Sequence, residues 1–260
     1  MKLGNGTFLK GDCLELMKDI PQGTVDLILC DLPYGTTSCA WDSIIPFEPL
    51  WEQYWRVIKA NGAIVLTSAQ PFTTALISSQ IKHFKYTWVW DKISVTGFAN
   101  ASKQPLRHLE DVCVFYKKQP TYNPQGVQMA SVVRKNSASQ GGATLKGEHI
   151  SNGKGSLRTA GKEHRQEFTN FPKQRIEISR ETGFHPTQKP VALFEYIIKT
   201  YTNPGEMVLD NTAGSGTTAI AAENTKRQWI CMEQNDEYYE KAVERVKDNN
   251  PSIGNDLFSF

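Results

Sequence analysis

Short apolar segments alternate with amphipathic ones along most of the chain. Seven apolar segments predict strands, at residues 7–10, 25–30, 63–68, 86–90, 111–116, 207–210 and 229–233. Six amphipathic segments predict helices, at residues 13–18, 48–57, 71–80, 191–200, 217–224 and 237–247. The nearly continuous apolar run from Val25 to Cys30 is typical of a parallel strand buried on both faces. The alternation therefore predicts an α/β protein with a doubly wound, mainly parallel sheet.

The middle of the chain breaks this pattern. Residues 131–180 hold ten basic and four acidic residues, a local charge of +6 in a chain whose net charge is +2. Six glycines lie between residues 141 and 161, where large apolar residues are almost absent. We expect a long flexible loop there. It is either a solvated linker or a basic arm that contacts phosphates.

Length and composition narrow the class of protein. A chain of 260 residues favours one large domain with an insertion. No apolar run approaches the ~18 residues of a membrane span, and the first six residues lack the apolar core of a signal peptide. We therefore expect a cytoplasmic protein without a membrane partner. The five cysteines and five histidines show no ligand spacing, so we expect neither disulfides nor a metal site.

A glycine-rich turn follows the strand predicted at residues 207–210. Gly214, Gly216 and Ala219 fit the G-x-G-x-x-A pattern, in which small residues let a ligand and a helix approach closely. Asp210 would repel a pyrophosphate but suits a ligand with an ammonium group. Glu233 ends the next strand, where a carboxylate accepts hydrogen bonds from ribose hydroxyls. The pattern favours a cationic adenosine ligand over NAD, with a tight turn into a buried helix as the alternative.

A second turn follows the strand predicted at residues 25–30. Its sequence is Asp31-Leu32-Pro33-Tyr34. Pro33 fixes its own φ and restrains Leu32, which gives the Leu32 carbonyl a defined direction. That carbonyl and the Asp31 carboxylate form an acceptor pair suited to an amino group, and an exposed Tyr34 ring could stack on a planar base. An ordinary turn with Asp31 capping nearby amides is the alternative.

These residues resemble a known family. Asp31-Leu32-Pro33-Tyr34 resembles the Asp-Pro-Pro-Tyr motif of amino-group DNA methyltransferases, with leucine in place of one proline, and residues 210–217 resemble their S-adenosylmethionine loop. Gly11-Asp12 before one helix and residues 185–190 before another agree with the same family. The order, catalytic motif first and cofactor loop last, resembles the β group of DNA adenine-N6 methyltransferases. The resemblance covers roughly residues 7–116 and 184–247.

The resemblance implies a seven-stranded Rossmann-like methyltransferase sheet. The catalytic half would be residues 1–120, a basic target-recognition insert residues 121–183, and the cofactor half residues 184–260. The implied catalytic residues are Asp31, Leu32, Pro33 and Tyr34. Asp210 would face the methionine ammonium of S-adenosylmethionine, Glu233 the ribose and Asp12 the adenine amino group, although Asp12 could instead only cap a helix. Thr187 and Lys189 would lie near the methionine carboxylate or support its pocket, although Pro190 as the first residue of a helix explains part of that segment without a ligand. Further implied cofactor residues are Thr212, Gly214, Gly216 and Thr217 in the loop.

The implied reaction is methyl transfer from S-adenosylmethionine to the N6 amino group of an adenine flipped out of double-stranded DNA. Cytosine-N4 methylation is the nearest alternative, although aspartate at the first motif position accompanies mostly adenine. An RNA or protein-amide methyltransferase, a nicotinamide-dependent oxidoreductase and a non-catalytic nucleic-acid-binding module are further alternatives. The recognition sequence, a cognate restriction enzyme and the choice between monomer and homodimer stay open.

Overall fold

The structure is a computed structural model that describes residues 1–35, 42–130, 167–181 and 188–249. The chain forms two compact units. The main unit comprises residues 1–123 and 173–260, and the smaller unit comprises residues 124–172. Each unit is described by itself below.

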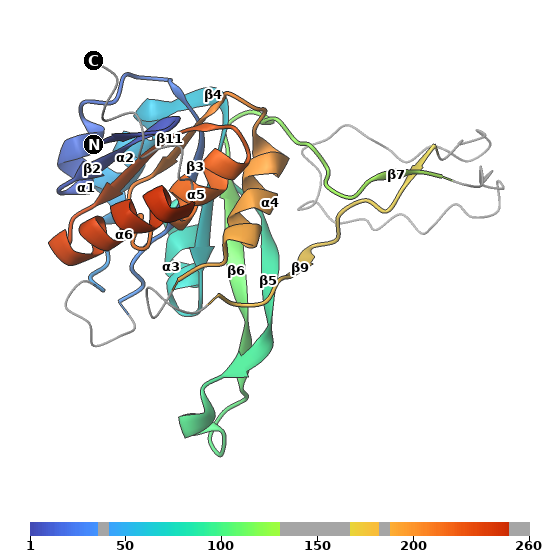
Figure 1. Cartoon of the computed structure of the whole chain (residues 1–260). Helices are drawn as coiled ribbons and strands as arrows, with labels where there is room; N and C mark the ends of the chain where they lie inside the picture. The colour runs from blue at the N-terminus through green and yellow to red at the C-terminus, as the bar shows by residue number, and fades with distance from the viewer. Residues whose placement is uncertain (36–41, 131–166, 182–187, 250–260) are drawn as a thin grey trace. The chain divides into compact units, whose positions relative to one another are not determined.

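The main unit is built on a nine-stranded sheet with the order β1-β2-β11-β10-β3-β4-β6-β5-β9 (Figure 1). All seven expected strands are present, and they form the middle of the sheet. They are β2 (Gly6–Lys10), β3 (Val25–Asp31), β4 (Ile58–Ser68), β5 (Phe84–Thr96), β6 (Arg107–Phe115), β10 (Met207–Asp210) and β11 (Gln228–Glu233). The short strands β1 (Lys2–Leu3) and β9 (Arg175–Glu177) extend the two edges. The expected α/β fold is confirmed, and the sheet has nine strands where seven were expected.

The order in which the chain adds strands to the sheet changes direction at one point, between β10 and β3. The neighbouring strands from β2 through β11, β10 and β3 to β4 are all parallel, whereas β6 is antiparallel to both β4 and β5. From β3 the chain continues to β4 on one side, and from β10 it continues to β11 on the other side. In such sheets ligands bind at the carboxyl ends of the two strands that flank this switch point. The carboxyl ends of β3 and β10 are therefore where a site is expected.

Helices cover both faces of the sheet, and all six match the expected positions. They are α1 (Cys13–Met17), α2 (Phe47–Val57), α3 (Phe72–Ser79), α4 (Val191–Tyr201), α5 (Thr217–Asn224) and α6 (Asp236–Asn249). Along β3, Leu27 and Leu29 belong to the core beneath α4, α5 and α6, while Ile28 and Cys30 belong to the core beneath α1, α2 and α3. This alternation explains the nearly continuous apolar run of β3, because both of its faces are buried.

Strands β5 and β6 are longer than their apolar segments predicted. Beyond the sheet they continue as a two-stranded arm, with a short 3-10 helix at Phe98–Asn100 near its end (Figure 1). Ile93, Phe98 and Leu109 of this arm are exposed. The apolar core does not extend to these residues. The strand pairing of the arm, such as Thr96 with Arg107, therefore leaves no apolar run for a sequence pattern to detect.

The smaller unit has a two-stranded sheet made of β7 (Gln128–Met129) and β8 (Phe168–Thr169). Its bounds fall inside the insert expected at residues 121–183. Residues 173–181 belong instead to the main unit, because β9 pairs with β5. The loop expected at residues 141–161 lies outside the described residues. In the part of the chain that is described, no helix is long and apolar enough to cross a membrane.

Candidate active site

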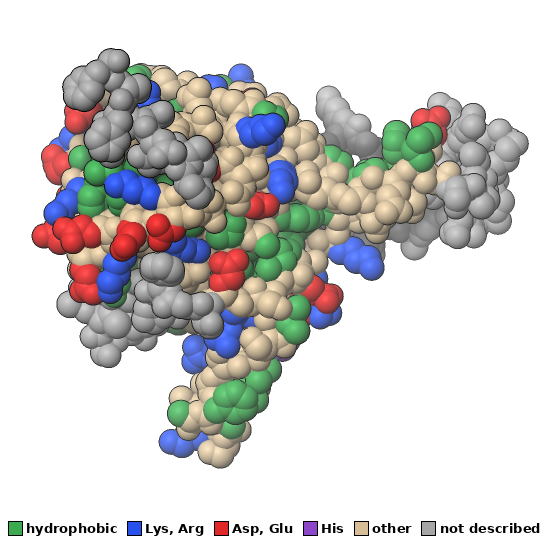
Figure 2. Space-filling view, in the orientation of Figure 1, with side chains coloured by type: hydrophobic (Ala, Val, Ile, Leu, Met, Phe, Trp, Pro, Cys, Tyr) green, Lys and Arg blue, Asp and Glu red, His purple; other side chains and the backbone are tan. Residues whose placement is uncertain are grey.

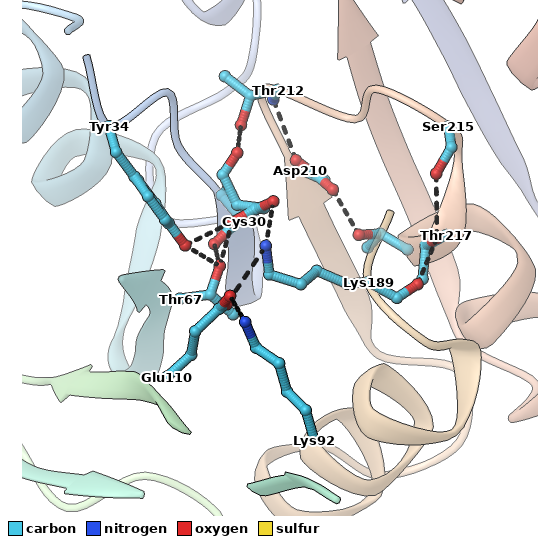
Figure 3. A network of polar contacts seen from close by, with 12 residues as sticks. Cys30, Tyr34, Thr67, Lys92, Glu110, Lys189, Asp210, Thr212, Ser215 and Thr217 are labelled. Atoms are coloured by element: carbon cyan, nitrogen blue, oxygen red, sulfur yellow. Dashed lines mark hydrogen bonds and ion pairs between the residues drawn. The ribbon is translucent and has the colours of Figure 1, made fainter. Parts of the chain in front are cut away.

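The pairing of β3 with β10 brings together two carboxylates that lie far apart in the sequence. Val208 and Leu209 pair with Leu27 and Ile28 in parallel register, so Asp31 and Asp210 leave the sheet at the same edge. The Thr212 hydroxyl donates a hydrogen bond of 3.1 Å to the Asp31 carbonyl, which connects the two turns (Figure 3). The expected catalytic turn and the expected cofactor loop are therefore neighbours.

The Asp31 carboxylate is held by three donors. Its Oδ1 accepts hydrogen bonds from the Tyr34 hydroxyl at 2.7 Å and from Thr67 Oγ1 at 2.5 Å. Its Oδ2 lies 2.6 Å from the ammonium nitrogen of Lys189. Thr67 is the register partner of Asp31 on β4, so the sheet itself places the hydroxyl beside the carboxylate. The Asp31 side chain keeps 23% of its surface exposed, so a ligand can reach it.

The rest of the Asp31 turn is more buried than expected. Tyr34 was expected to be exposed, but it is half-buried and its ring stacks on Phe72 with 5.1 Å between ring centroids. Burial, together with the charge of Asp31, raises the pKa of Tyr34 well above its usual value, so its hydroxyl stays protonated and donates. The Leu32 side chain is buried in the core. Leu32 can therefore serve a ligand only through its backbone, as expected.

Asp210 is the buried carboxylate of the cofactor loop. It accepts hydrogen bonds from the Thr212 amide at 3.0 Å and from the Thr218 hydroxyl. Burial raises the pKa of Asp210 to about 7, against the lowering effect of these two donors. A carboxylate in this position gains from a cationic ligand, because an ammonium group would offset the cost of its buried charge.

The two glycines of the loop have different roles. Both have positive φ, of 51° at Gly214 and 73° at Gly216. Among the residues that the structure describes, a Cβ added at Gly214 would meet only the Thr212 carbonyl oxygen, at 4.0 Å, so these residues leave space on this side of the loop. A Cβ at Gly216 would lie 3.3 Å from both Ala242 and Val246 of α6. Gly214 therefore permits a ligand to approach the backbone, whereas Gly216 permits the packing of α6.

The other two carboxylates expected at the cofactor belong to Glu233 and Asp12, whose backbones are brought near each other by the pairing of β11 with β2. Glu233 is the register partner of Lys10, and the Gly11 amide donates to the Glu233 carbonyl at 3.0 Å. The Glu233 carboxylate accepts from the amide of Gly214 at 2.9 Å, and burial raises its pKa. Asp12 caps α1 by accepting from the amides of residues 14 and 15. The cap is thus observed, and the contacts of Asp12 and Glu233 with a ligand stay predictions.

Lys189 contacts both the Asp31 turn and the cofactor loop, so its expected role near the methionine carboxylate or in support of its pocket stays a prediction. Its ammonium is buried and paired with Asp31. Only its backbone meets the cofactor loop, because the Thr217 hydroxyl donates to the Lys189 carbonyl at 3.1 Å. Figure 3 shows the Lys189 side chain directed toward Glu110 and Thr67. Thr187 lies outside the described residues.

Three polar residues of this site were missed by the sequence analysis. Thr67 ends a strand that was predicted, so aligning the carboxyl ends of neighbouring strands could have found it. Glu110 and Lys92, which pair at 2.5 Å, lie on β6 and β5 beyond the predicted strand segments. No sequence motif indicated either of them.

The described residues fit a bound adenosine cofactor. The open side of Gly214 provides room at the backbone, and the buried carboxylate of Asp210 and the half-buried carboxylate of Glu233 each accept from a backbone amide of the loop, at Thr212 and Gly214. No group of three or more His, Cys, Asp or Glu side chains among the described residues could hold a metal ion.

A comparison with family models decides the family. The model described as DNA methylase matches residues 25–244. The chain belongs to the DNA methylase family. This confirms the expected family, and it sets aside the nicotinamide-dependent oxidoreductase.

Curated relatives of this methylase are named as DNA-modifying enzymes. The DNA adenine methyltransferase YhdJ of Escherichia coli is 29% identical over 257 residues, covering 92% of this chain and 82% of its own. The Type II methyltransferase M1.MboII of Moraxella bovis is also 29% identical, covering 89% of this chain and 92% of its own.

Solved structures share the fold of this methylase. The M1.HpyAVI complex with S-adenosylmethionine superposes with a TM-score of 0.64 at 23% identity, covering 92% of this chain and 99% of its own. The cytosine-N4-specific PvuII DNA methyltransferase superposes with a TM-score of 0.66 at 17% identity, covering 97% and 93%. Since a cytosine-specific enzyme has the same fold, the fold alone does not choose the target base.

The different surroundings of the two glycines lead to a first prediction. Gly214→Val should lower the affinity for S-adenosylhomocysteine by about tenfold or more, because the side chain enters the open space beside the loop. Calorimetric titration measures this affinity. Gly216→Ala is the matched control, because it should mainly lower the melting temperature by disturbing the contact with α6. Normal cofactor affinity in a folded Gly214→Val protein would remove this face of the loop from the site.

The raised pKa of Asp210 leads to a second prediction. As the pH falls below about 7, Asp210 takes up a proton and loses its attraction for the ligand's ammonium group, which stays protonated in this range. The association constant for S-adenosylhomocysteine should therefore fall with decreasing pH, by up to about tenfold per unit. Asp210→Asn should bind weakly, with little pH dependence over the same range. A wild-type affinity that stays constant from about pH 7.5 to 5.5 would contradict the assignment.

Proposed function

We propose that this DNA methylase transfers a methyl group from S-adenosylmethionine to the N6 amino group of an adenine flipped out of double-stranded DNA. The observation that carries the proposal is the position of Asp31. Its carboxylate ends β3 beside the loop of Asp210 and Gly214, and it is oriented by Tyr34 and Thr67. An amino-group acceptor and a cofactor loop thus meet at the switch point of the sheet.

The residues of the turn supply position and electrostatics. S-adenosylmethionine, when bound, supplies a methyl group activated by a positively charged sulfur. The Asp31 carboxylate and the Leu32 carbonyl would accept the two protons of the amino group, which localises the nitrogen lone pair. Positive charge then develops on that nitrogen, and the Asp31 carboxylate stabilises it. Tyr34 and Thr67 keep Oδ1 of Asp31 in place, so little reorganisation is needed when the base arrives.

The target base must leave the duplex, since its amino group is paired there. The half-buried Tyr34 ring, which stacks on the buried ring of Phe72, offers a rigid aromatic group at the turn. Stacking of a base on such a surface is worth roughly 1 to 3 kcal/mol, comparable to the few kcal/mol that flipping costs. This supports a base-flipping enzyme over a non-catalytic binding module.

Adenine is the favoured target base. YhdJ, a relative that aligns with 92% of this chain, is named an adenine methyltransferase, and Asp31 stands where the resembling family has aspartate mostly with adenine. Cytosine-N4 is the second candidate, because the cytosine-N4-specific PvuII enzyme has the same fold and the fold therefore does not exclude this base.

Two segments are proposed to contact DNA. The first is the basic stretch at residues 131–180, whose centre lies outside the described residues. The second is the arm of β5 and β6, which carries exposed Lys103, Arg107 and Phe98. Figure 2 shows basic and hydrophobic side chains on the surface of this arm. Basic side chains contact phosphates independently of sequence, whereas apolar tips can contact bases or sugars.

The role of Asp31 leads to a third prediction. Asp31→Ala should abolish methyl transfer while changing the affinity for S-adenosylhomocysteine only about twofold, because Asp31 touches the target amine and not the donor. Transfer is followed with labelled methyl donor on duplex DNA, and hydrolysis of the wild-type product identifies the nucleoside as N6-methyladenine.

Asp31→Asn is the matched control for folding, because it keeps the size of the side chain. Near wild-type turnover in either variant, or a loss of cofactor binding in proportion to the loss of activity, would show that Asp31 has another role. Recovery of N4-methylcytosine from the wild-type reaction would favour the second candidate.

The basic stretch leads to a fourth prediction. Replacing Lys154, Arg158, Lys162 and Arg165 with alanine should flatten the slope of log DNA affinity against log salt by up to about 3 to 4 units, because each lost phosphate contact removes ~0.9. Cofactor affinity should not change. The matched variant Lys103→Ala/Arg107→Ala tests the arm. An unchanged slope in the fourfold variant, with DNA affinity intact, would make the stretch a linker and place DNA contacts on the arm.

A further inference from the structure

The four charged residues of the site form a chain of alternating sign that the proposed reaction does not by itself explain. Lys92 pairs with Glu110 at 2.5 Å, Lys189 lies 3.5 Å from the other oxygen of Glu110, and Lys189 pairs with Asp31 at 2.6 Å. The Lys189 and Glu110 side chains are 6% and 13% exposed, so solvent screens their interaction little. Figure 3 shows Lys189 between Glu110 and the Asp31 turn.

Lys189 weakens the catalytic carboxylate as an acceptor. Oδ1 of Asp31 already accepts from the hydroxyls of Tyr34 and Thr67, so Oδ2 is the oxygen with room for a substrate amine. The Lys189 ammonium donates to Oδ2 at 2.6 Å and takes one of its two acceptor positions. It also neutralises the negative charge that should stabilise the developing positive charge on the target nitrogen. Full use of the Asp31 charge in the proposed reaction therefore requires the lysine to move away.

The structure contains a place for it to go. Oε2 of Glu110 is buried and receives no hydrogen bond from any described residue. Because Lys92 holds Oε1, the Glu110 carboxylate is already oriented. A shift of the ammonium by about 0.7 Å toward Glu110 would turn the 3.5 Å separation into a charge-assisted hydrogen bond of ordinary length. Because this shift alone leaves the ammonium at most about 3.3 Å from Oδ2 of Asp31, the ammonium must swing further around Oε2 to release Asp31.

The backbone of Lys189 can stay in place during this shift. Its carbonyl accepts from Thr217 at the first turn of α5, and Arg245 donates to the same hydroxyl at 3.1 Å. Only the flexible end of the side chain has to move. Burial by itself would lower the pKa of Lys189, but the charges of Asp31 and Glu110 outweigh it and the pKa is raised, so the group remains an ammonium in either position.

The geometry points to Lys189 as a movable counter-ion that holds Asp31 Oδ2 in the free enzyme and transfers to Glu110 Oε2 when the target amino group docks. This inference rests on the proposed function. Lys189 is thus a positioning residue, and Glu110 is the acceptor that makes its departure favourable. A fixed structural ion pair would instead leave Asp31 neutralised throughout the reaction.

A double-mutant cycle separates the two possibilities. In Glu110→Gln the receiving charge is absent and Lys189 stays on Asp31, so the single-turnover methylation rate should fall about tenfold or more. In the double variant Glu110→Gln/Lys189→Met nothing blocks Asp31, so the rate should rise at least about fivefold above that of Glu110→Gln. If the ion pairs only stabilised the structure, the outcome would be the opposite. Removing Lys189 in addition to Glu110 would then lower the methylation rate further or leave it unchanged.

Controls keep the comparison interpretable. Melting temperature and the affinity for S-adenosylhomocysteine, measured on every variant, report folding and the cofactor site. Lys199→Met is the matched control for loss of a lysine, since it breaks an ion pair with Glu195 on α4, at 2.9 Å, and should leave the rate unchanged.

The inference is overturned if Glu110→Gln keeps the wild-type rate, or if the double variant is no faster than Glu110→Gln. Its failure is distinct from failure of the proposed function. The nucleoside methylated by the wild type tests the target base, whereas the ratio of variant rates tests the counter-ion on whichever base is methylated.

Discussion

The parallel pairing of β3 with β10 is the constraint on which the site depends. About 180 residues separate the two strands in the sequence, yet Val208 and Leu209 pair directly with Leu27 and Ile28. The pairing fixes the order of every other strand, because the chain leaves β3 in one direction and β10 in the other. Both turns therefore open at one edge of the sheet, and Thr212 joins them through the Asp31 carbonyl. Any change that slipped this register by one residue would turn both aspartates toward the opposite faces of the sheet.

The electrostatics of the site divide into two parts that meet at Lys189. On the cofactor side, the carboxylate of Asp210 is held by neutral donors, and burial raises its pKa. On the catalytic side, the Asp31 carboxylate is paired with the buried ammonium group of Lys189. The first carboxylate thus gains most from a ligand that brings positive charge, whereas the second must lose its counter-ion before it can act. Since Thr217 binds the backbone of Lys189, the loop that holds the cofactor also anchors the residue that covers Asp31.

The sequence predicted the parts of the fold that rest on apolar periodicity and on local turn chemistry. All seven inner strands and all six helices were located, because β3 and its neighbours are buried on both faces and the helices bury one face each. Asp31 and Asp210 could be found because each ends an apolar strand, and Gly214 because it lies in the glycine-rich turn that follows Asp210. The position of the Lys189 ammonium could not be found, since a lysine side chain reaches any of several partners and only the folded structure selects one. Glu110 lies on a strand whose outer half contacts solvent, where no apolar pattern exists.

A buried polar cluster explains why the two turns can be rigid without being continuous in sequence. Asn211, directly after Asp210, accepts a hydrogen bond from the Tyr54 hydroxyl at 2.6 Å and donates to the Cys13 sulfur at 3.3 Å. Cys30, directly before Asp31, contacts the same amide oxygen at 2.9 Å. One asparagine thus ties together α1, α2, β3 and the cofactor loop. Because every unpaired polar group in such a place would be costly, the cluster favours a single arrangement of these four segments. While this cluster holds the two turns in place, the flexible end of the Lys189 side chain can change partners. The motion that we infer for substrate docking is therefore confined to one side chain.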